Sequence, residues 1–408
     1  MSRPSATAQS HALPSDFDAW ERRIGAFVSM AEDTTITATG SLAGHVVAVK
    51  DVIDVAGLPT RNGSAACAES APAPSDAPVV ARLRAAGARI LGKTVTTEFA
   101  FTDPTQCRNP YAPARSPGGS SSGSGAAVGA GLVDIALGTQ TAGSLCRPAA
   151  YCGAVGFKPG RGVLPMEGVT PLSPSHDMVG IIARNIACAE AAFMAMCDRP
   201  QPVADPVRRV GSLILDRTTP VDPARLAALD TATGILATNI GPVTHLPALS
   251  DAEQIVTDHR TVMVAEAARA HGHLLDSAAQ ALLKPNFREG LRAGRAIASE
   301  RRAAARQRLA VARQAFWHRH ADVDVIVTLP VPEGPPLMGE STGFQHWLTV
   351  WTVLGGPLLC LPWGLDQDGL PLSVMFAGRP GEDARLLRFG RDIAAEAPLT
   401  PSPPLPAD

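Results

Sequence analysis

The chain has 408 residues, of which 45% are hydrophobic and 18% charged, so it can bury a large core and is neither disordered nor fibrous. Its formal net charge of -2 argues against a nucleic acid or an anionic membrane as a partner, because either favours a basic surplus. No stretch approaches a membrane span without polar interruption, and residues 1–18 lack the apolar core of a signal peptide. We therefore expect a cytoplasmic protein that binds a small molecule. Its oligomeric state is left open, a homodimer included.

The cysteines are odd in number, scattered, and without a close pair of metal-type motifs. We expect free thiols packed as small hydrophobic side chains, and no metal site. The seven positions are Cys67, Cys107, Cys146, Cys152, Cys188, Cys197 and Cys360.

The first part of the chain alternates helices and strands. Residues 16–30 have the spacing of an amphipathic helix with Phe27 facing inward. The apolar run 46–49 is typical of a buried strand, and it delivers Lys50 at its end. The next expected elements are a helix, a strand and a further helix, at 76–86, 89–92 and 94–101.

The Gly/Ser-rich stretch 116–156 contains two turns that can each present a serine hydroxyl. A Pro-Gly-Gly sequence forces an irregular backbone before Ser120, and a small-residue helix is expected over 123–132. Residues 133–138 predict a buried strand that leads into the sequence TQTAGS at 139–144. Small residues there let several amide N–H groups converge, which is the shape of an oxyanion pocket.

The rest of the chain continues the α/β pattern and shows no internal repeat. The helix expected at 289–317 is rich in Arg and Ala at helical spacing, which predicts solvated faces. Strands are expected at 210–215, 323–327, 358–362 and 372–377, and helices at 223–240, 251–270, 289–317 and 383–394.

Several other candidates for a reactive site have weaker support. Gly119 to Gly123 matches G-x-S-x-G with Ser121 as nucleophile, but a loop-like segment precedes it and no histidine sits in a supporting setting. The run misses both phosphate-loop patterns. Cys146 is expected to line the site wall without acting as a second nucleophile. Four further histidines are expected at the surface, namely His271, His273, His318 and His320.

Three segments together resemble the amidase signature family. They are AVKDVIDVAGLP around Lys50, GGSSSGSGAAVGAGL at 118–132, and GTQTAGSLCRPAAYCGAVGFKP at 138–159. Weaker likenesses at 76–94, 323–332 and 369–387 extend the match over nearly all of the chain outside 198–320. The resemblance implies a single α/β domain over 1–408 with a mixed central sheet covered by helices. It also divides the chain into a signature core at about 40–198, a variable helical pocket region at about 198–320, and closing elements at about 321–396.

The resemblance also implies a role for each matching residue. Ser144 in the T-x-G-S turn is the nucleophile, Ser120 is bound through a cis peptide and relays a proton, and Lys50 is the base. No metal or organic cofactor is needed for such a mechanism. The backbone amides of three preceding residues, with that of the nucleophile, form the oxyanion hole, here Thr141, Ala142 and Gly143.

Two departures from the family pattern bear on the substrate. Ala142 stands where a glycine is usual. Either its methyl group narrows the substrate pocket, or the turn accommodates this group without loss of activity. Arginine lies three places after the nucleophile, at Arg147, a spacing similar to that of malonamidases, in which this side chain holds the substrate carboxylate. The alternative is that Arg147 only ties down the next turn.

The expected function is hydrolysis of a small amide, with ammonia or an amine as a product and a dicarboxylic acid monoamide as one candidate substrate. One alternative is the glutaminase subunit of a tRNA-dependent amidotransferase. Another is a catalytically silent binding protein on the same scaffold.

Overall fold

The computed structural model describes residues 14–32, 39–198 and 205–405, which form a single α/β domain around one mixed sheet. The order of its eleven strands is β1-β3-β2-β4-β6-β5-β10-β11-β9-β7-β8. In chain order they are Phe27–Met30 (β1), Val46–Lys50 (β2), Arg89–Thr94 (β3), Ile135–Gln140 (β4), Val155–Lys158 (β5), Met178–Ala183 (β6), Val210–Ser212 (β7), Val243–His245 (β8), Val325–Thr328 (β9), Leu358–Leu365 (β10) and Pro371–Gly378 (β11). The expected mixed sheet is confirmed.

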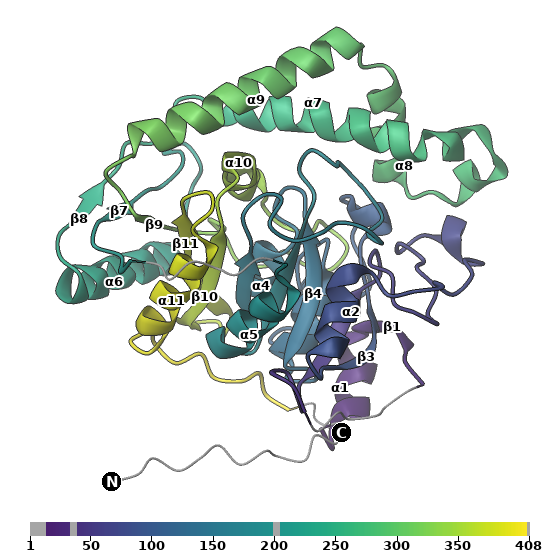
Figure 1. Cartoon of the computed structure of the whole chain (residues 1–408), viewed down its shortest axis with the longest axis horizontal. Coiled ribbons are helices and arrows are strands. Elements are labelled where there is room, and N and C mark those ends of the chain that lie inside the picture. Colours follow the sequence, from purple (N-terminus) through teal and green to yellow (C-terminus); the bar gives the residue numbers. More distant parts are fainter. Residues whose placement is uncertain (1–13, 33–38, 199–204, 406–408) are drawn as a thin grey trace.

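Helices cover this sheet, and two long ones lie side by side along one end of the molecule (Figure 1). These are α7 and α9, with α8 packed against α7 and with α10 in contact with both long helices. The helices are Phe17–Ile24 (α1), Pro78–Ala85 (α2), Ser122–Gly129 (α3), Cys146–Tyr151 (α4), Ile186–Met196 (α5), Pro223–Asn239 (α6), Ala252–His271 (α7), Pro285–Arg295 (α8), Ser299–Arg319 (α9), His346–Leu354 (α10) and Asp383–Ala394 (α11).

Sheet pairing brings the carboxyl ends of β2 and β4 to the same edge of the sheet. Strand β2 lies between β3 and β4, parallel to both, and all five of its residues are buried. Val49 pairs with Leu137 of β4, so both strands end at the same edge of the sheet. Lys50 at the end of β2 therefore lies beside the residues that follow β4.

Three of the expected elements were wrong. The helix expected over 16–30 ends at Ile24, because Gly25 adopts a left-handed conformation with a φ of 58°, and Phe27 begins strand β1. The helix expected over 94–101 is replaced by the end of β3 and a single 3-10 turn at Glu98–Ala100, in which Phe99 has a positive φ.

The single helix expected over 289–317 is two helices, α8 and α9. Gly294 near the end of α8 approaches α7 so closely that a Cβ atom there would lie 1.9 Å from the carbonyl oxygen of Val264. The chain then turns after Arg295, which allows α9 to pack along α7 as well.

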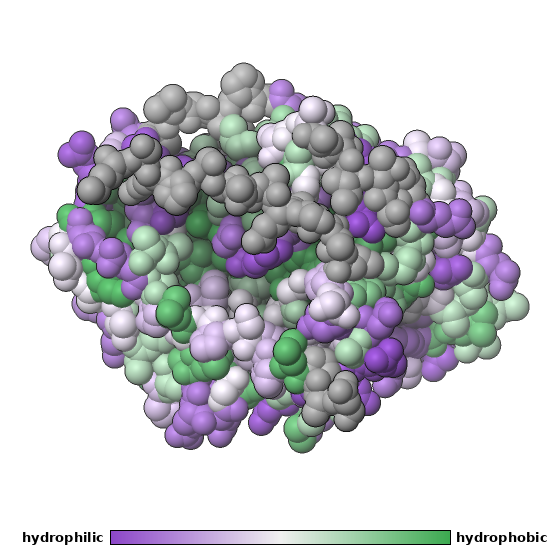
Figure 2. Space-filling view, turned by 90° about the horizontal axis from the view of Figure 1, so that it is seen from below, coloured by the Kyte–Doolittle hydropathy of each residue, from purple (hydrophilic) through white to green (hydrophobic). Residues whose placement is uncertain are grey.

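No helix among the described residues is long and apolar enough to cross a membrane. In the view of Figure 2, hydrophilic and hydrophobic residues are intermixed over the coloured part of the face opposite α7 and α9. The expectation about a signal peptide concerns a segment of which residues 1–13 lie outside the described part of the chain.

Candidate active site

Lys50 is completely buried at the carboxyl end of β2, and its amine has two side-chain partners. Its Nζ lies 2.6 Å from the Ser120 hydroxyl and 2.7 Å from the Thr139 hydroxyl. Burial lowers the pKa of Lys50 well below its ordinary value, because removal from water disfavours the cation. Nearby Asp177 raises this pKa and Arg147 lowers it, both less strongly than burial does. Burial at this position therefore favours the neutral form of the amine.

Ser120 follows an irregular turn that its surroundings hold in place. Gly118 has a φ of 83°, which favours glycine, and a Cβ atom there would be in tight contact with the Tyr151 ring, at 3.0 Å. The Gly119–Ser120 peptide bond is cis. The Ser120 carbonyl accepts a hydrogen bond from the Thr97 amide, so the residue is fixed on its backbone side as well as at its hydroxyl.

Ser144 lies in the turn that links β4 to α4. The Gln140 side chain stabilises this turn, since its Oε1 accepts hydrogen bonds from the amides of Leu145 and Cys146, each at 3.0 Å. The Ser144 carbonyl accepts a hydrogen bond from the Ser121 amide at 3.2 Å, which joins the two serine turns directly. Within the described residues the Ser144 hydroxyl donates to no protein acceptor.

Arg147 is 2% exposed and its guanidinium donates to backbone and hydroxyl oxygens around the Ser120 turn. Both Nε and Nη2 donate to the Gly119 carbonyl, at 3.1 and 2.6 Å. A further bond from Nη2 reaches the Thr342 hydroxyl, and Nη1 donates to the Gly343 carbonyl. Burial lowers the pKa of Arg147 to about 10, which keeps it cationic at neutral pH. These bonds occupy four of its five N–H groups and leave one on Nη1.

The comparisons with known proteins identify the family of this chain. The Amidase family model matches residues 26–387. This chain belongs to the amidase family. It is 34% identical to the putative amidase AmiB2 of Mycobacterium tuberculosis over 88% of this chain and 82% of that protein. It is 33% identical to the 2-amino-5-chloromuconic acid deaminase of Comamonas testosteroni, over 87% and 82% of the two chains.

Its fold also matches that of a solved amidase structure. The two superpose with a TM-score of 0.84 and 27% sequence identity, over 93% of this chain and 94% of the other. The protein is therefore an enzyme, an amidohydrolase that acts on amides.

Two residues that the sequence interpretation missed lie beside the candidate site residues. Thr139 is the second partner of the Lys50 amine. Asp177 precedes β6, and its carboxylate accepts a hydrogen bond from the Thr141 hydroxyl at 2.6 Å and others from the Leu172 and Ser173 amides, each at 2.8 Å. Burial raises the pKa of Asp177. Asp177 thus anchors the first residue of the expected oxyanion turn.

The weaker candidates take other places in the fold. Ser121 is buried and its hydroxyl donates to the Thr139 carbonyl at 3.3 Å, so it joins the two turns. Cys146 is buried at the first position of α4. The seven cysteines all lie in the described part of the chain and none is in a disulfide; five of them are buried and two half-buried. No cluster of potential metal ligands occurs within the described residues.

The expectation of four surface histidines was wrong for two of them. His271 is 7% exposed and its Nε2 hydrogen-bonds to the Pro171 carbonyl, and its ring lies against Phe99 at 4.6 Å between centroids. His320 is 5% exposed and packs on Phe316. Each histidine gains packing or a hydrogen bond that its local sequence does not reveal.

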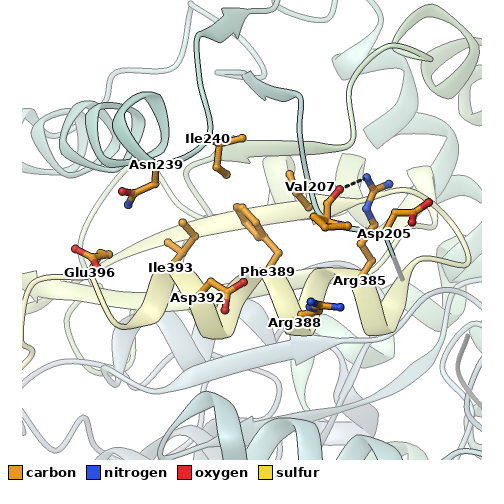
Figure 3. Close-up of a pocket in the computed structure, with 11 residues that line it drawn as sticks. Asp205, Val207, Asn239, Ile240, Arg385, Arg388, Phe389, Asp392, Ile393 and Glu396 are labelled. Carbon is orange, nitrogen blue, oxygen red and sulfur yellow. Dashed lines mark hydrogen bonds between the residues drawn. The ribbon is translucent and has the colours of Figure 1, made fainter. Parts of the chain in front are cut away.

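A cavity of about 340 Å³ lies elsewhere in the amidase, against the side chains of α11 (Figure 3). Arg385 at its rim donates to the Pro206 carbonyl at 3.0 Å and pairs with Asp324 at 3.2 Å. The lining comes from α11, from the end of α6 and from residues 205–207, so neither serine turn contributes to it. The candidate active site therefore lies outside this cavity.

Proposed function

We propose that this amidase hydrolyses the C–N bond of a small amide through an acyl-enzyme on Ser144, with Ser120 as proton relay and Lys50 as base. The observation that carries the proposal is the 2.6 Å contact between the fully buried Lys50 amine and the Ser120 hydroxyl. A buried amine whose pKa is lowered by desolvation can act as a base at a lower pH than an ordinary lysine can.

The proposed reaction begins with two proton transfers. Neutral Lys50 takes the proton of the Ser120 hydroxyl, Ser120 takes that of Ser144, and Ser144 Oγ attacks the amide carbonyl carbon. Negative charge develops on the carbonyl oxygen, where amides of the turn from Thr141 to Ser144 stabilise it; losing one such donor typically costs about 3 kcal/mol. The protonated Lys50 returns its proton through Ser120 to the leaving nitrogen, which departs as ammonia or an amine. Water then hydrolyses the ester by the same relay.

For the substrate we propose a small amide that carries a carboxylate, such as a dicarboxylic acid monoamide. Arg147 supports this proposal, because it is cationic, lies beside the Ser120 turn and has one N–H group left for an anion. The relative named as a deaminase of an acid supports it as well. The finer likeness to malonamidases, the cytoplasmic location and the three-part division of the chain stay predictions.

The experiment that tests the proposal measures ammonia release from malonamate, simple aliphatic amides, aryl amides, ureides and glutamine. We expect turnover of a small amide, with malonamate favoured over an uncharged amide of equal length. Absence of turnover with every compound, together with no labelling by a fluorophosphonate, would favour the silent binding protein. Preference for glutamine together with copurifying partner chains would favour the glutaminase subunit. Neither alternative is favoured by the relatives above.

A change at Arg147 separates substrate binding from support of the turn. Arg147→Met should lower kcat/KM for malonamate about 10- to 100-fold more than for butanamide, because only the former loses a charged hydrogen bond. The variant also removes the hydrogen bonds to the Gly119 carbonyl, and any loss of kcat/KM from this cause should be equal for both substrates. Steady-state kinetics with the two substrates measures the ratio. An equal loss for both would mean that the guanidinium only fixes the turn.

A further inference from the structure

A histidine from the variable helical region contacts the expected oxyanion turn. His259 lies on α7 and is 2% exposed, and its Nε2 lies 2.8 Å from the Thr141 carbonyl oxygen. A carbonyl oxygen can only accept a hydrogen bond, so Nε2 carries the proton. Burial lowers the pKa of His259 to about 4, so the ring is neutral at pH 7. The contact is therefore a neutral hydrogen bond from α7 to the turn.

The next carbonyl of the turn is held from a different helix. Thr352 on α10 donates its hydroxyl to the Ala142 carbonyl at 2.5 Å and accepts a hydrogen bond from the Gln140 side chain at 2.9 Å. Leu348, one turn earlier on α10, packs so closely on Gly143 that a Cβ atom there would lie 3.0 Å from it. Two successive carbonyls of the turn are thus pinned by residues more than 100 positions away.

Peptide planarity connects these carbonyls to the amides of the oxyanion hole. Within one trans peptide unit the C=O and the following N–H point in opposite directions. The bond to the Thr141 carbonyl therefore fixes the direction of the Ala142 N–H, and the bond to the Ala142 carbonyl fixes that of the Gly143 N–H. In the described part of the chain, neither N–H donates to a protein acceptor. Both are available to a substrate oxygen.

The His259 ring is itself held in one orientation. His176 lies against it with 4.5 Å between ring centroids. Ser173 donates to Glu266 on α7 at 2.7 Å, so its hydroxyl can accept from His176 Nδ1, which lies 3.2 Å away. Ser175 also donates to Glu266 through its amide and its hydroxyl. The loop that carries His176 is thus fastened to the helix that carries His259.

We infer that His259 and Thr352 are positioning residues that aim the amides of Ala142 and Gly143 at the oxyanion. This inference rests on the proposed acyl-transfer function. It gives α7, from the variable helical region, and α10, from the closing part of the chain, a part in catalysis: the two helices supply the hydrogen bonds that hold the oxyanion turn in register before the substrate arrives. Such preorganisation acts on the transition state more than on the bound amide.

Two matched pairs of variants test the inference. His259→Gln and Thr352→Ser each keep a donor, whereas His259→Leu and Thr352→Val each remove it with little change in size. We expect the donor-removing variants to lose about 10- to 100-fold in kcat with KM within about threefold of the wild type, since misaimed oxyanion donors weaken only the transition state. The donor-keeping variants should stay within about fivefold of wild-type kcat.

A second measurement excludes a merely structural effect. A substrate-like aldehyde that forms a tetrahedral adduct with Ser144 should bind the donor-removing variants more weakly, by the same factor as the loss in kcat/KM, while the product acid binds unchanged. If one variant fails to fold, the other pair tests the neighbouring carbonyl of the same turn. Wild-type kcat in folded His259→Leu and Thr352→Val would overturn the inference alone. Absence of amide turnover in the wild type would overturn the proposed function and this inference with it.

Discussion

Replacement of Ser144 by alanine should lower amide hydrolysis at least about 10⁴-fold and leave the fold intact. The hydroxyl is the proposed nucleophile, and without it the proposed acyl-enzyme cannot form, so the loss should approach that of removing a whole catalytic unit. The side chain donates no hydrogen bond to a protein acceptor in the described residues, so its removal breaks no such contact. Ammonia release at saturating substrate measures the effect, and circular dichroism with thermal melting checks the fold.

Ser121→Ala is the matched control for this prediction, because Ser121 occupies the nucleophile position of the competing G-x-S-x-G pattern. A fluorophosphonate should still label the Ser121→Ala variant but fail to label the Ser144→Ala variant. Mass spectrometry of a tryptic digest locates the adduct. An adduct on Ser121, or turnover that survives in Ser144→Ala, would show that the nucleophile has been assigned to the wrong turn.

The two serine turns and the strand-end lysine could be found from the sequence because each lies in a short motif with strong local signals. Glycines before Ser120 and small residues before Ser144 dictate unusual backbone conformations. Lys50 closes an apolar run that is typical of a buried strand. The order of these motifs then supported the family resemblance, which the family match confirms.

Thr139 was missed because its role depends on strand register. It lies two residues beyond Leu137, the partner of Val49, and this places its hydroxyl 2.7 Å from the Lys50 amine. The sequence predicted both strands, yet a parallel pairing between strands far apart in the chain leaves no local signal of which residues meet. The available signal was that a residue with a hydroxyl group directly follows the apolar run 133–138.

His259 and Thr352 could not be found for a related reason. The sequence predicted a helix over 251–270, and the structure has α7 at Ala252–His271, but helical periodicity does not say what the buried polar residues of a helix contact. Each of the two residues serves a carbonyl more than 100 positions away. These hydrogen bonds form only in the tertiary structure, where both helices pack on the turn.

Replacement of Lys50 by methionine should lower kcat by about 10³-fold or more. Methionine has a similar length and no basic nitrogen, so Ser120 loses the group that accepts its proton, and general-base contributions are typically 10²- to 10⁴-fold. Lys50→Arg is the matched control: it keeps a positive charge that cannot be lost near neutral pH and should be as inactive as the methionine variant. Activity that survives in Lys50→Arg would contradict a role for the neutral amine.

The pH dependence of the wild type gives an independent check on Lys50. Its neutral form becomes populated as pH rises through its lowered pKa, so kcat/KM should rise with pH and level off well below pH 10.5.

The folded enzyme binds fewer protons at Lys50 than the unfolded chain between the lowered pKa and about 10.4, so the free energy of unfolding should fall as pH falls through this window. Lys50→Met removes the contribution of Lys50 to the pH dependence of stability, whereas the buried Lys93 and Lys158 keep their contributions. Denaturant unfolding of the wild type and of Lys50→Met at several pH values therefore isolates the contribution of Lys50. A wild-type profile that climbs without a plateau to pH 10.5, with unfolding curves that change in parallel in both proteins, would mean that Lys50 is an ordinary cation and that another group takes the serine proton.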